Sequence, residues 1–200
     1  MLSGLQTAVL LALAVALGVW LAPRVGLRAP AVSSWMAGQP AGPALRAQLV
    51  PGLWGGVAGA AWLWLLSRLA PAALQPSDPD NAMPLAVKLL YGGITEELLM
   101  RWGVMTLLLW LGWRLLRRGH GQPRNGLVAT AVLFSAVLFA VGHLPAAQAM
   151  AGVLTMPVVA FVLVGNTVFG LVAGGLFARH GLEAAIIAHV LAHLLASLLL

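Results

Sequence analysis

Long apolar runs, separated by short polar segments, make up most of this sequence of 200 residues. Each run is near or above the roughly 20 residues that an α-helix needs to cross a bilayer. A soluble chain of this length could not bury them, because 61% of its residues are hydrophobic and only 8% are charged, whereas soluble domains are about half apolar and about a quarter charged. The sequence therefore predicts an all-α, polytopic transmembrane helical bundle of about six to seven helices, with apolar runs near residues 2–21, 49–70, 84–113, 126–144, 152–178 and 182–200.

The boundaries of these runs indicate how several of the helices begin or end. The first run has no basic segment before it and is long enough to span, so we expect a retained transmembrane helix rather than a signal peptide. Before the third run, Asp80 or Asn81 can cap the helix and Pro84 suits its first turn. The fifth run contains Pro157, which can kink the helix or break it into two pieces. No internal repeat is evident, so we expect one integral membrane domain over residues 1–200, with its polar motifs within residues 84–200.

The charged residues predict an orientation in the membrane. The formal net charge is +6, and the arginines gather in the polar segments 22–48, 114–125 and 178–183. Placing these three segments in the cytoplasm follows the positive-inside rule and puts both termini on the other side. We therefore expect a multi-pass protein of the bacterial inner (cell) membrane. No aromatic and basic residues interleave as in a nucleic-acid surface, so no nucleic-acid partner is expected. The absence of cysteine excludes disulfides, thiolate metal sites and a cysteine nucleophile.

Two adjacent glutamates and an arginine lie inside the third apolar run, where each charge costs several kcal/mol, roughly, if it is left unpaired. Glu97 and Arg101 are four residues apart, share a helical face and can form an ion pair. Glu96 is rotated by about 100° from Glu97, so it lacks that partner. A single Glu–Arg pair would favour a structural role between helices. The additional glutamate favours a functional site, in which a carboxylate acts as general acid or base.

Three histidines occupy two other apolar runs. His143 follows Phe139 by four residues and precedes Pro145, so the helix is expected to end or bend there. Taken alone, it is more typical of an interfacial residue than of a ligand. His189 and His193 are four apart on one face of the last helix. Such a pair can form hydrogen bonds between helices, bind a metal, or stabilise a developing oxyanion. The HExxH zinc signature is absent, since Val190 follows His189.

Taken together, these clusters resemble the motifs of the CPBP family of intramembrane proteases, also called the CAAX-protease or Abi family. Its EExxxR motif corresponds to Glu96, Glu97 and Arg101. Its FxxxH motif corresponds to Phe139 and His143, and its HxxxN motif corresponds in part to His189. EExxxR alone is a weak pattern, but all three motifs occur here in order, each within an apolar run. The third motif usually ends in Asn, sometimes Asp, whereas this chain has His193.

The resemblance implies a membrane-embedded endopeptidase that hydrolyses a peptide bond of a membrane-associated protein or peptide. In that picture Glu96 and His143 polarise a water molecule that attacks the peptide carbonyl. His189 and His193 would steady the tetrahedral oxyanion, and Glu97 and Arg101 would shape the site and balance its charge. Both a metallo-type and a purely glutamate-dependent mechanism have been argued for the family, so a divalent metal such as zinc stays an open question.

Two other classes of function remain open from the sequence. The chain could be a non-enzymatic membrane scaffold or a bacteriocin self-immunity protein, with the polar cluster serving only to hold helices together. It could also carry protons, a metal or haem, since paired histidines and a carboxylate within a bundle suit each of these. The positions of the polar residues fit the protease motifs better than they fit a carrier.

Overall fold

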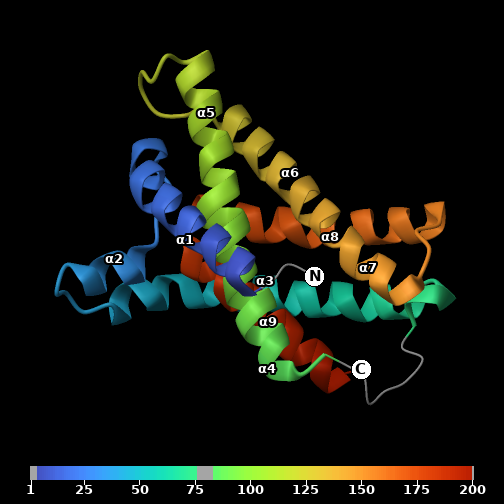
Figure 1. Cartoon of the computed structure of the whole chain (residues 1–200). Coiled ribbons are helices and arrows are strands. Elements are labelled where there is room, and N and C mark those ends of the chain that lie inside the picture. Colours follow the sequence, from blue (N-terminus) through green and yellow to red (C-terminus); the bar gives the residue numbers. More distant parts are fainter. Residues whose placement is uncertain (1–3, 76–82, 200) are drawn as a thin grey trace.

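The computed structural model describes residues 4–75 and 83–199, and every regular element within these ranges is a helix (Figure 1). Within these ranges, five helical segments are long and apolar enough to cross a membrane. The predicted all-α membrane bundle is therefore confirmed. The spans are α1 (Gly4–Leu21), α3 (Gly42–Leu69), α6 (Asn125–Gly142) with the short α7 (Leu144–Ala151), α8 (Met156–Arg179) and α9 (Leu182–Leu199).

A further long helix carries the two glutamates. It consists of α4 (Leu85–Val87), two π-helical stretches (Lys88–Thr95 and Leu98–Met105) and α5 (Thr106–Leu116), which follow one another along one axis in Figure 1. Pro84, predicted for the first turn, is instead the residue immediately before it, and Asp80 and Asn81 lie outside the described residues. π-helical turns are rare and are frequently found at functional sites.

Prolines account for most of the differences from the predicted boundaries. The segment 22–48, predicted as a polar loop, contains the short 3-10 turn Ala22–Val25 and α2 (Pro30–Met36), and α3 begins seven residues earlier than expected. The kink or break that Pro157 could cause does not occur, because this proline lies in the first turn of an uninterrupted α8. A proline in a first turn removes no helical hydrogen bond, so it starts a helix rather than breaking it. The bend expected at His143 is confirmed, since α6 ends there and α7 follows.

Glycines on α3 allow it to lie very close to α9. A Cβ atom on Gly52, Gly56 or Gly59 would come within 2.9 Å of an atom of α9. Small residues at such positions let helix backbones approach each other, which is how helices associate where lipid tails are as apolar as the side chains. This close packing fixes the last helix, and its two histidines, against the rest of the bundle.

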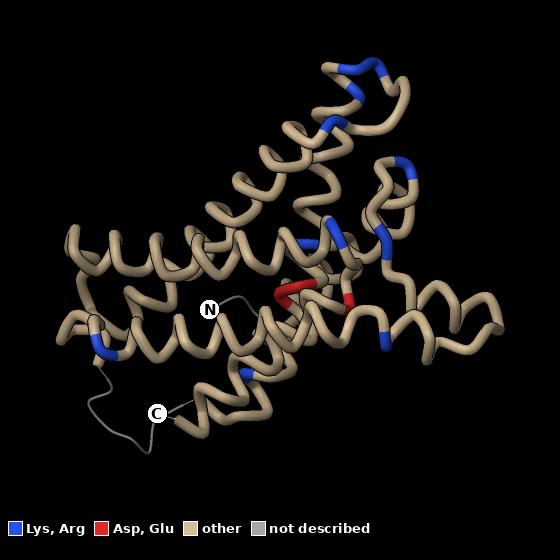
Figure 2. The backbone as a smooth tube through the Cα atoms, turned by 180° about the vertical axis from the view of Figure 1, so that it is seen from behind, with Lys and Arg blue, Asp and Glu red and all other residues tan. Residues whose placement is uncertain are grey.

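Most of the arginines gather at one end of the bundle, which we call the basic end. There α1, α5 and α8 finish and α3, α6 and α9 begin, so the basic end comprises the connecting segments 22–41, 117–124 and 180–181 (Figure 2). Two hydrogen bonds join the first and last of these regions: the Leu182 N–H donates to the Arg28 carbonyl (3.0 Å), and the Val32 N–H donates to Glu183 Oε1 (3.0 Å). The three basic segments of the sequence thus lie on the same side.

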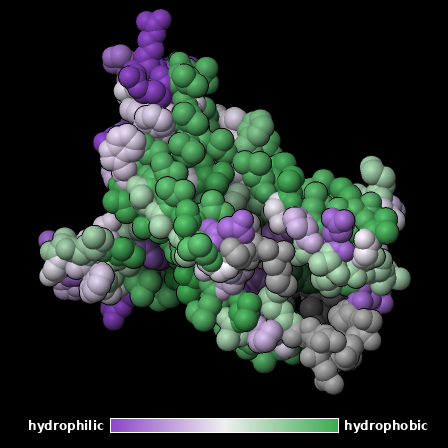
Figure 3. Space-filling view, in the orientation of Figure 1, coloured by the Kyte–Doolittle hydropathy of each residue, from purple (hydrophilic) through white to green (hydrophobic). Residues whose placement is uncertain are grey.

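The outer surface of the bundle is largely apolar, and the strongly polar residues gather mainly at the tips (Figure 3). Leu5, Trp54 and Leu115 are examples of large apolar side chains that are more than 70% exposed. In water such a surface would be an aggregation hazard, but it suits contact with lipid tails. The chain is a multi-pass membrane protein.

Candidate active site

A fully buried ion pair lies at the centre of the bundle. Glu97 and Arg101 have no exposed side-chain surface, and Glu97 Oε2 lies 3.3 Å from Arg101 Nε. Glu97 Oε1 accepts a hydrogen bond from Nδ1 of His189, which lies 2.8 Å away on α9. Arg101 also donates to the Gly170 carbonyl of α8 (3.4 Å) and stacks over the Phe139 ring of α6 (4.8 Å to its centroid). The pair predicted from the sequence therefore connects four helices.

Glu96 points to a different partner, as its place on the helix predicts. Its Oε1 lies 3.9 Å from Nε2 of His143 at the end of α6. Nδ1 of His143 is 2.8 Å from the Phe139 carbonyl, which can only accept a hydrogen bond, so Nδ1 carries a proton. In the neutral ring Nε2 then keeps its lone pair and faces Glu96. These two side chains are 18% and 32% exposed, so neither is enclosed in the core.

The two histidines of α9 stack on each other. Their ring centroids are 4.9 Å apart and the ring planes differ by 22°. Phe169 of α8 flanks the His189 ring at 4.6 Å. His193 lies over Gly92 of the long helix, where an added Cβ would be 2.8 Å from Nε2 of the histidine. The absence of a side chain at Gly92 therefore provides the space for His193, which stands where the family motif has Asn.

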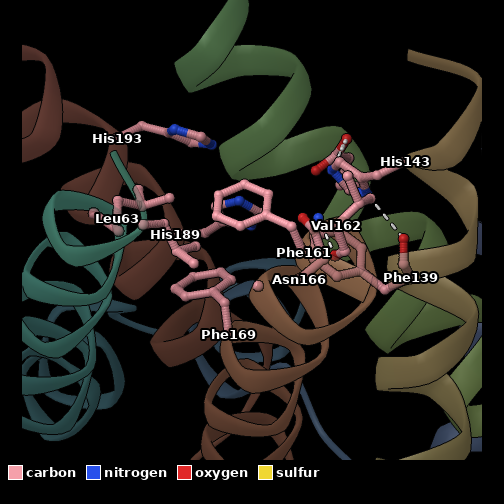
Figure 4. Close-up of a pocket in the computed structure, with 13 residues that line it drawn as sticks. Leu63, Phe139, His143, Phe161, Val162, Asn166, Phe169, His189 and His193 are labelled. Carbon is pink, nitrogen blue, oxygen red and sulfur yellow. Dashed lines mark hydrogen bonds and ion pairs between the residues drawn. The ribbon is translucent and has the colours of Figure 1, made fainter. Parts of the chain in front are cut away.

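One cavity brings these groups together (Figure 4). It has a volume of ≈ 160 Å³, and Glu96, His143, His189 and His193 all line it. Glu97 and Arg101 do not line the cavity, so four of the six predicted residues meet there and the other two lie behind them. Apolar side chains from α3 and α8 complete the wall, including Leu63, Leu66, Phe161 and Phe169.

Asn166 of α8 also lines the cavity, although nothing in its sequence context predicts this position. Its Nδ2 donates one hydrogen bond to the Val162 carbonyl one turn earlier (2.9 Å). An amide nitrogen has two protons, so a second donor remains available. The sequence shows only an isolated Asn in an apolar run, which is equally typical of contacts between helices. Only the packing of α8 against α6 and α9 places it in this site.

A zinc site in a protein requires three or more suitable donors around one point. Among the described residues, no group of three His, Cys, Asp or Glu side chains is arranged to hold a metal ion. Two of the available donor atoms are also engaged elsewhere, since Nδ1 of His189 bonds to Glu97 and Nδ1 of His143 bonds to a backbone carbonyl. The side chains therefore do not fit a zinc site in this arrangement.

Comparison with known proteins agrees with the motifs. A model of the family described as type II CAAX prenyl endopeptidase Rce1-like matches residues 78–195, which is more than half of the chain. Comparisons with curated proteins and with solved structures gave no match. The matched segment runs from before the glutamate-bearing helix to beyond both histidines of α9. The chain therefore belongs to the Rce1-like family of type II CAAX prenyl endopeptidases, which are membrane proteases.

Proposed function

We propose that this protein is an intramembrane endopeptidase that hydrolyses a peptide bond with a water molecule activated by Glu96 and His143. The observation that carries the proposal is the convergence of Glu96, His143, His189 and His193, from three separate helices, on one cavity within an apolar bundle. Buried polar groups that serve only to join helices would be expected to bond to one another. Of these four, only His189 is hydrogen-bonded to a buried polar side chain, Glu97, and all four line the cavity.

The separation of Glu96 and His143 suits a bridging water. Their nearest atoms are 3.9 Å apart, too far for a direct hydrogen bond. If a water oxygen lies about 2.8 Å from both atoms, the angle at this oxygen between Glu96 Oε1 and His143 Nε2 is roughly 90°. The water could therefore donate one hydrogen bond to each acceptor. Both acceptors withdraw protons from the same oxygen, and this makes it a better nucleophile. No metal ligand set is required for this step.

The reaction then follows the usual course of peptide hydrolysis. The water oxygen forms a bond to the carbonyl carbon, and the π electrons of the carbonyl move to its oxygen. The proton released by the water passes to the Glu96–His143 pair, which delivers it to the leaving nitrogen as the C–N bond breaks. The products are a carboxylic acid and an amine, so atoms and charge balance.

The developing oxyanion requires donors on the opposite side of the cavity. His189 and His193 are in the right region, and the second amide proton of Asn166 is a further donor. Because Nδ1 of His189 donates to Glu97, its Nε2 is left for the substrate, and its N–H is a donor when the ring carries both protons. Glu97 and Arg101 would position this ring and balance its charge rather than touch the substrate.

The apolar lining of the cavity and the apolar outer surface favour a substrate that is itself membrane-associated, either a protein or a peptide. A substrate that partitions into the bilayer reaches the site by diffusion in two dimensions. Its apolar side chains can contact the wall formed by α3 and α8. The polar requirement is then limited to the scissile peptide group.

A comparison of Glu96→Gln with wild type, on a pool of membrane-protein-derived peptides in detergent, tests the proposal. We expect cleavage products with wild type, none with Glu96→Gln, and no effect of a chelator. Glu183→Gln is a matched control, because Glu183 is also nearly buried but lies outside the cavity, where its oxygen accepts the Val32 N–H. A Glu96→Gln protein that keeps the full biological activity would point to a scaffold or immunity protein. Loss of cleavage with chelator, restored by zinc, would show that the reaction needs a metal.

A further inference from the structure

Within the site, the side chains nearer the basic end are more buried than those further from it. On the long helix, Glu96 is 18% exposed, whereas Glu97 and Arg101, which lie nearer the basic end, are not exposed at all. On α6, His143 is 32% exposed, and Phe139, one turn nearer the basic end, is only 4% exposed. On both helices, the partly exposed residues of the site lie on the side away from the basic end.

The other two helices of the site show the same trend. On α9, His193 is partly exposed and His189, one turn nearer the basic end, is 4% exposed. On α8, Asn166 is partly exposed, and Ala173 and Phe177, further along toward the basic end, are completely buried. The partly exposed site residues of these four helices, which run in mixed directions, thus all lie further from the basic end than the buried residues named with them.

A core of apolar side chains separates the cavity from the basic end. Trp102, Met105 and Leu109 extend along the long helix beyond Arg101, and they pack in one cluster with Phe177 of α8. Val25, Leu27 and other residues of the segment 22–29 are buried in the same cluster. A peptide that approached from the basic end would have to displace this entire core.

The lining side chains also come largely from the far half of the bundle. Leu63 and Leu66 lie near the end of α3, and Phe161 lies in the second turn of α8, both at the end opposite to the basic one. His143 is the residue at which α6 finishes. The cavity is therefore closed on the side of the basic end and nearer to the opposite membrane surface.

The distribution of charge assigns the two faces. Of the eleven Lys and Arg residues, eight lie in the segments of the basic end or in the helical turns that adjoin them, only Arg68 and Lys88 lie toward the opposite end, and Arg101 is inside the bundle. The positive-inside rule places the richer end in the cytoplasm. The eight residues at the basic end are Arg24, Arg28, Arg46, Arg114, Arg117, Arg118, Arg124 and Arg179.

We propose that the cavity opens to the extracytoplasmic face of the membrane, and that the substrate is a peptide segment displayed on that face by a membrane-associated protein. The second half of this proposal rests on the proposed proteolytic function, whereas the first half is a statement about water access alone. Segments of exported or membrane-anchored proteins, just outside the lipid tails, are the class of substrate that such a site can reach.

Cysteine accessibility tests the opening without any need for activity, because the chain contains no cysteine of its own. Single variants are labelled with a small, membrane-impermeant methanethiosulfonate, in right-side-out and in inverted membrane vesicles. Asn166→Cys reports the cavity, His120→Cys the basic end, Gln75→Cys the opposite end, and Ser135→Cys a fully buried position.

We expect the Asn166 and Gln75 variants to be labelled only in right-side-out vesicles, the His120 variant only in inverted vesicles, and the Ser135 variant in neither. Labelling of the cavity variant from the same side as the His120 variant would overturn the proposal, and so would no labelling from either side. If the His120 variant reacts in right-side-out vesicles, the assignment of the extracytoplasmic face is wrong.

A second experiment tests the substrate class. A peptide that wild type cleaves in detergent is fused to a membrane anchor, on either its extracytoplasmic or its cytoplasmic side, in cells with wild type or Glu96→Gln. We expect cleavage of the extracytoplasmic fusion only, and only with wild type. Cleavage of the cytoplasmic fusion alone would overturn the substrate class. Cleavage of neither would count against proteolysis in the membrane, while the labelling result would still decide on the opening.

Discussion

The substitution Gly93→Ala tests whether the close approach of the long helix to α9 positions the site. Gly93 faces Val190, and an added Cβ would lie 2.5 Å from Val190 Cγ2, 3.1 Å from its Cα and 3.3 Å from its N. Comfortable contacts between carbon atoms are about 3.5–4.0 Å. Rotation of the valine side chain can relieve the first contact. The contact with Cα cannot be relieved in that way, so the two helices must move apart by several tenths of an ångström to about 1 Å.

The cost of this shift can be set from the structure. Overpacking of this kind costs about 1–3 kcal/mol, and the higher helix propensity of Ala returns about 1 kcal/mol. We therefore expect a modest loss of about 0–2 kcal/mol in the free energy of unfolding. The effect on catalysis should be larger, because a misplacement of about 1 Å in a catalytic group can cost roughly 10²-fold in rate. Glu96 lies on the long helix and His189 on α9, so a shift between these helices changes the position of one side chain relative to the other.

The assay compares kcat/KM on a cleaved peptide with the midpoint of thermal unfolding in detergent. Gly175→Ala is the matched control, because Gly175 is also in the interior of a helix and an added Cβ there meets nothing within 4 Å. We expect Gly175→Ala to keep full activity and equal or higher stability. If Gly93→Ala has the activity of Gly175→Ala, the positioning argument is refuted, whatever its stability.

Three further substitutions test individual contacts. Arg101→Met should lower the free energy of unfolding in detergent by about 3–5 kcal/mol, because it leaves the buried Glu97 carboxylate without a cation; adding Glu97→Gln should restore most of this, and no recovery would contradict the charge argument. Gly92→Ala should lower kcat/KM by displacing the tip of His193, and it should lower kcat/KM less in a His193→Asn background. A double-mutant cycle of the two substitutions measures this difference as a coupling energy, which would be zero if the two residues did not interact. Trp62→Phe should cost about 0.5–1.5 kcal/mol of stability, measured by thermal unfolding, because the indole N–H donates to an α8 carbonyl at 2.8 Å; an unchanged midpoint would show that the bond contributes nothing.

Local spacing was enough to predict much of the site. The pairing of Glu97 with Arg101 and the separate direction of Glu96 follow from the rotation of a helix by one residue and by four. The stacking of His189 on His193 follows from the same four-residue spacing. These features involve residues on one helix, so no knowledge of the other helices is needed to derive them.

Features that depend on two or more helices were not predictable in this way. The hydrogen bond between His189 and Glu97 joins residues that are far apart in the chain, and the sequence suggested only that each needed some partner. Asn166 enters the cavity because of how α8 lies against its neighbours. The early start of α3 was missed because a segment rich in Pro and Gly resembles a loop, although here Pro30 and Pro43 each lie in a first turn.

The two adjacent glutamates illustrate how one helix can supply both a structural and a reactive carboxylate. Glu97 faces the closed side of the site, where the arginine and the histidine engage both of its oxygens, so its charge is compensated and it cannot reach a substrate. Glu96, one residue earlier, faces the cavity and has only a distant histidine at 3.9 Å. A buried ion pair adds little net stability, but its geometry is specific. By fixing the rotation of the long helix and of His189 together, the Glu97–Arg101 pair would determine where Glu96 points, so we expect even Glu97→Gln, which keeps the shape of the side chain, to impair cleavage through the position of His189.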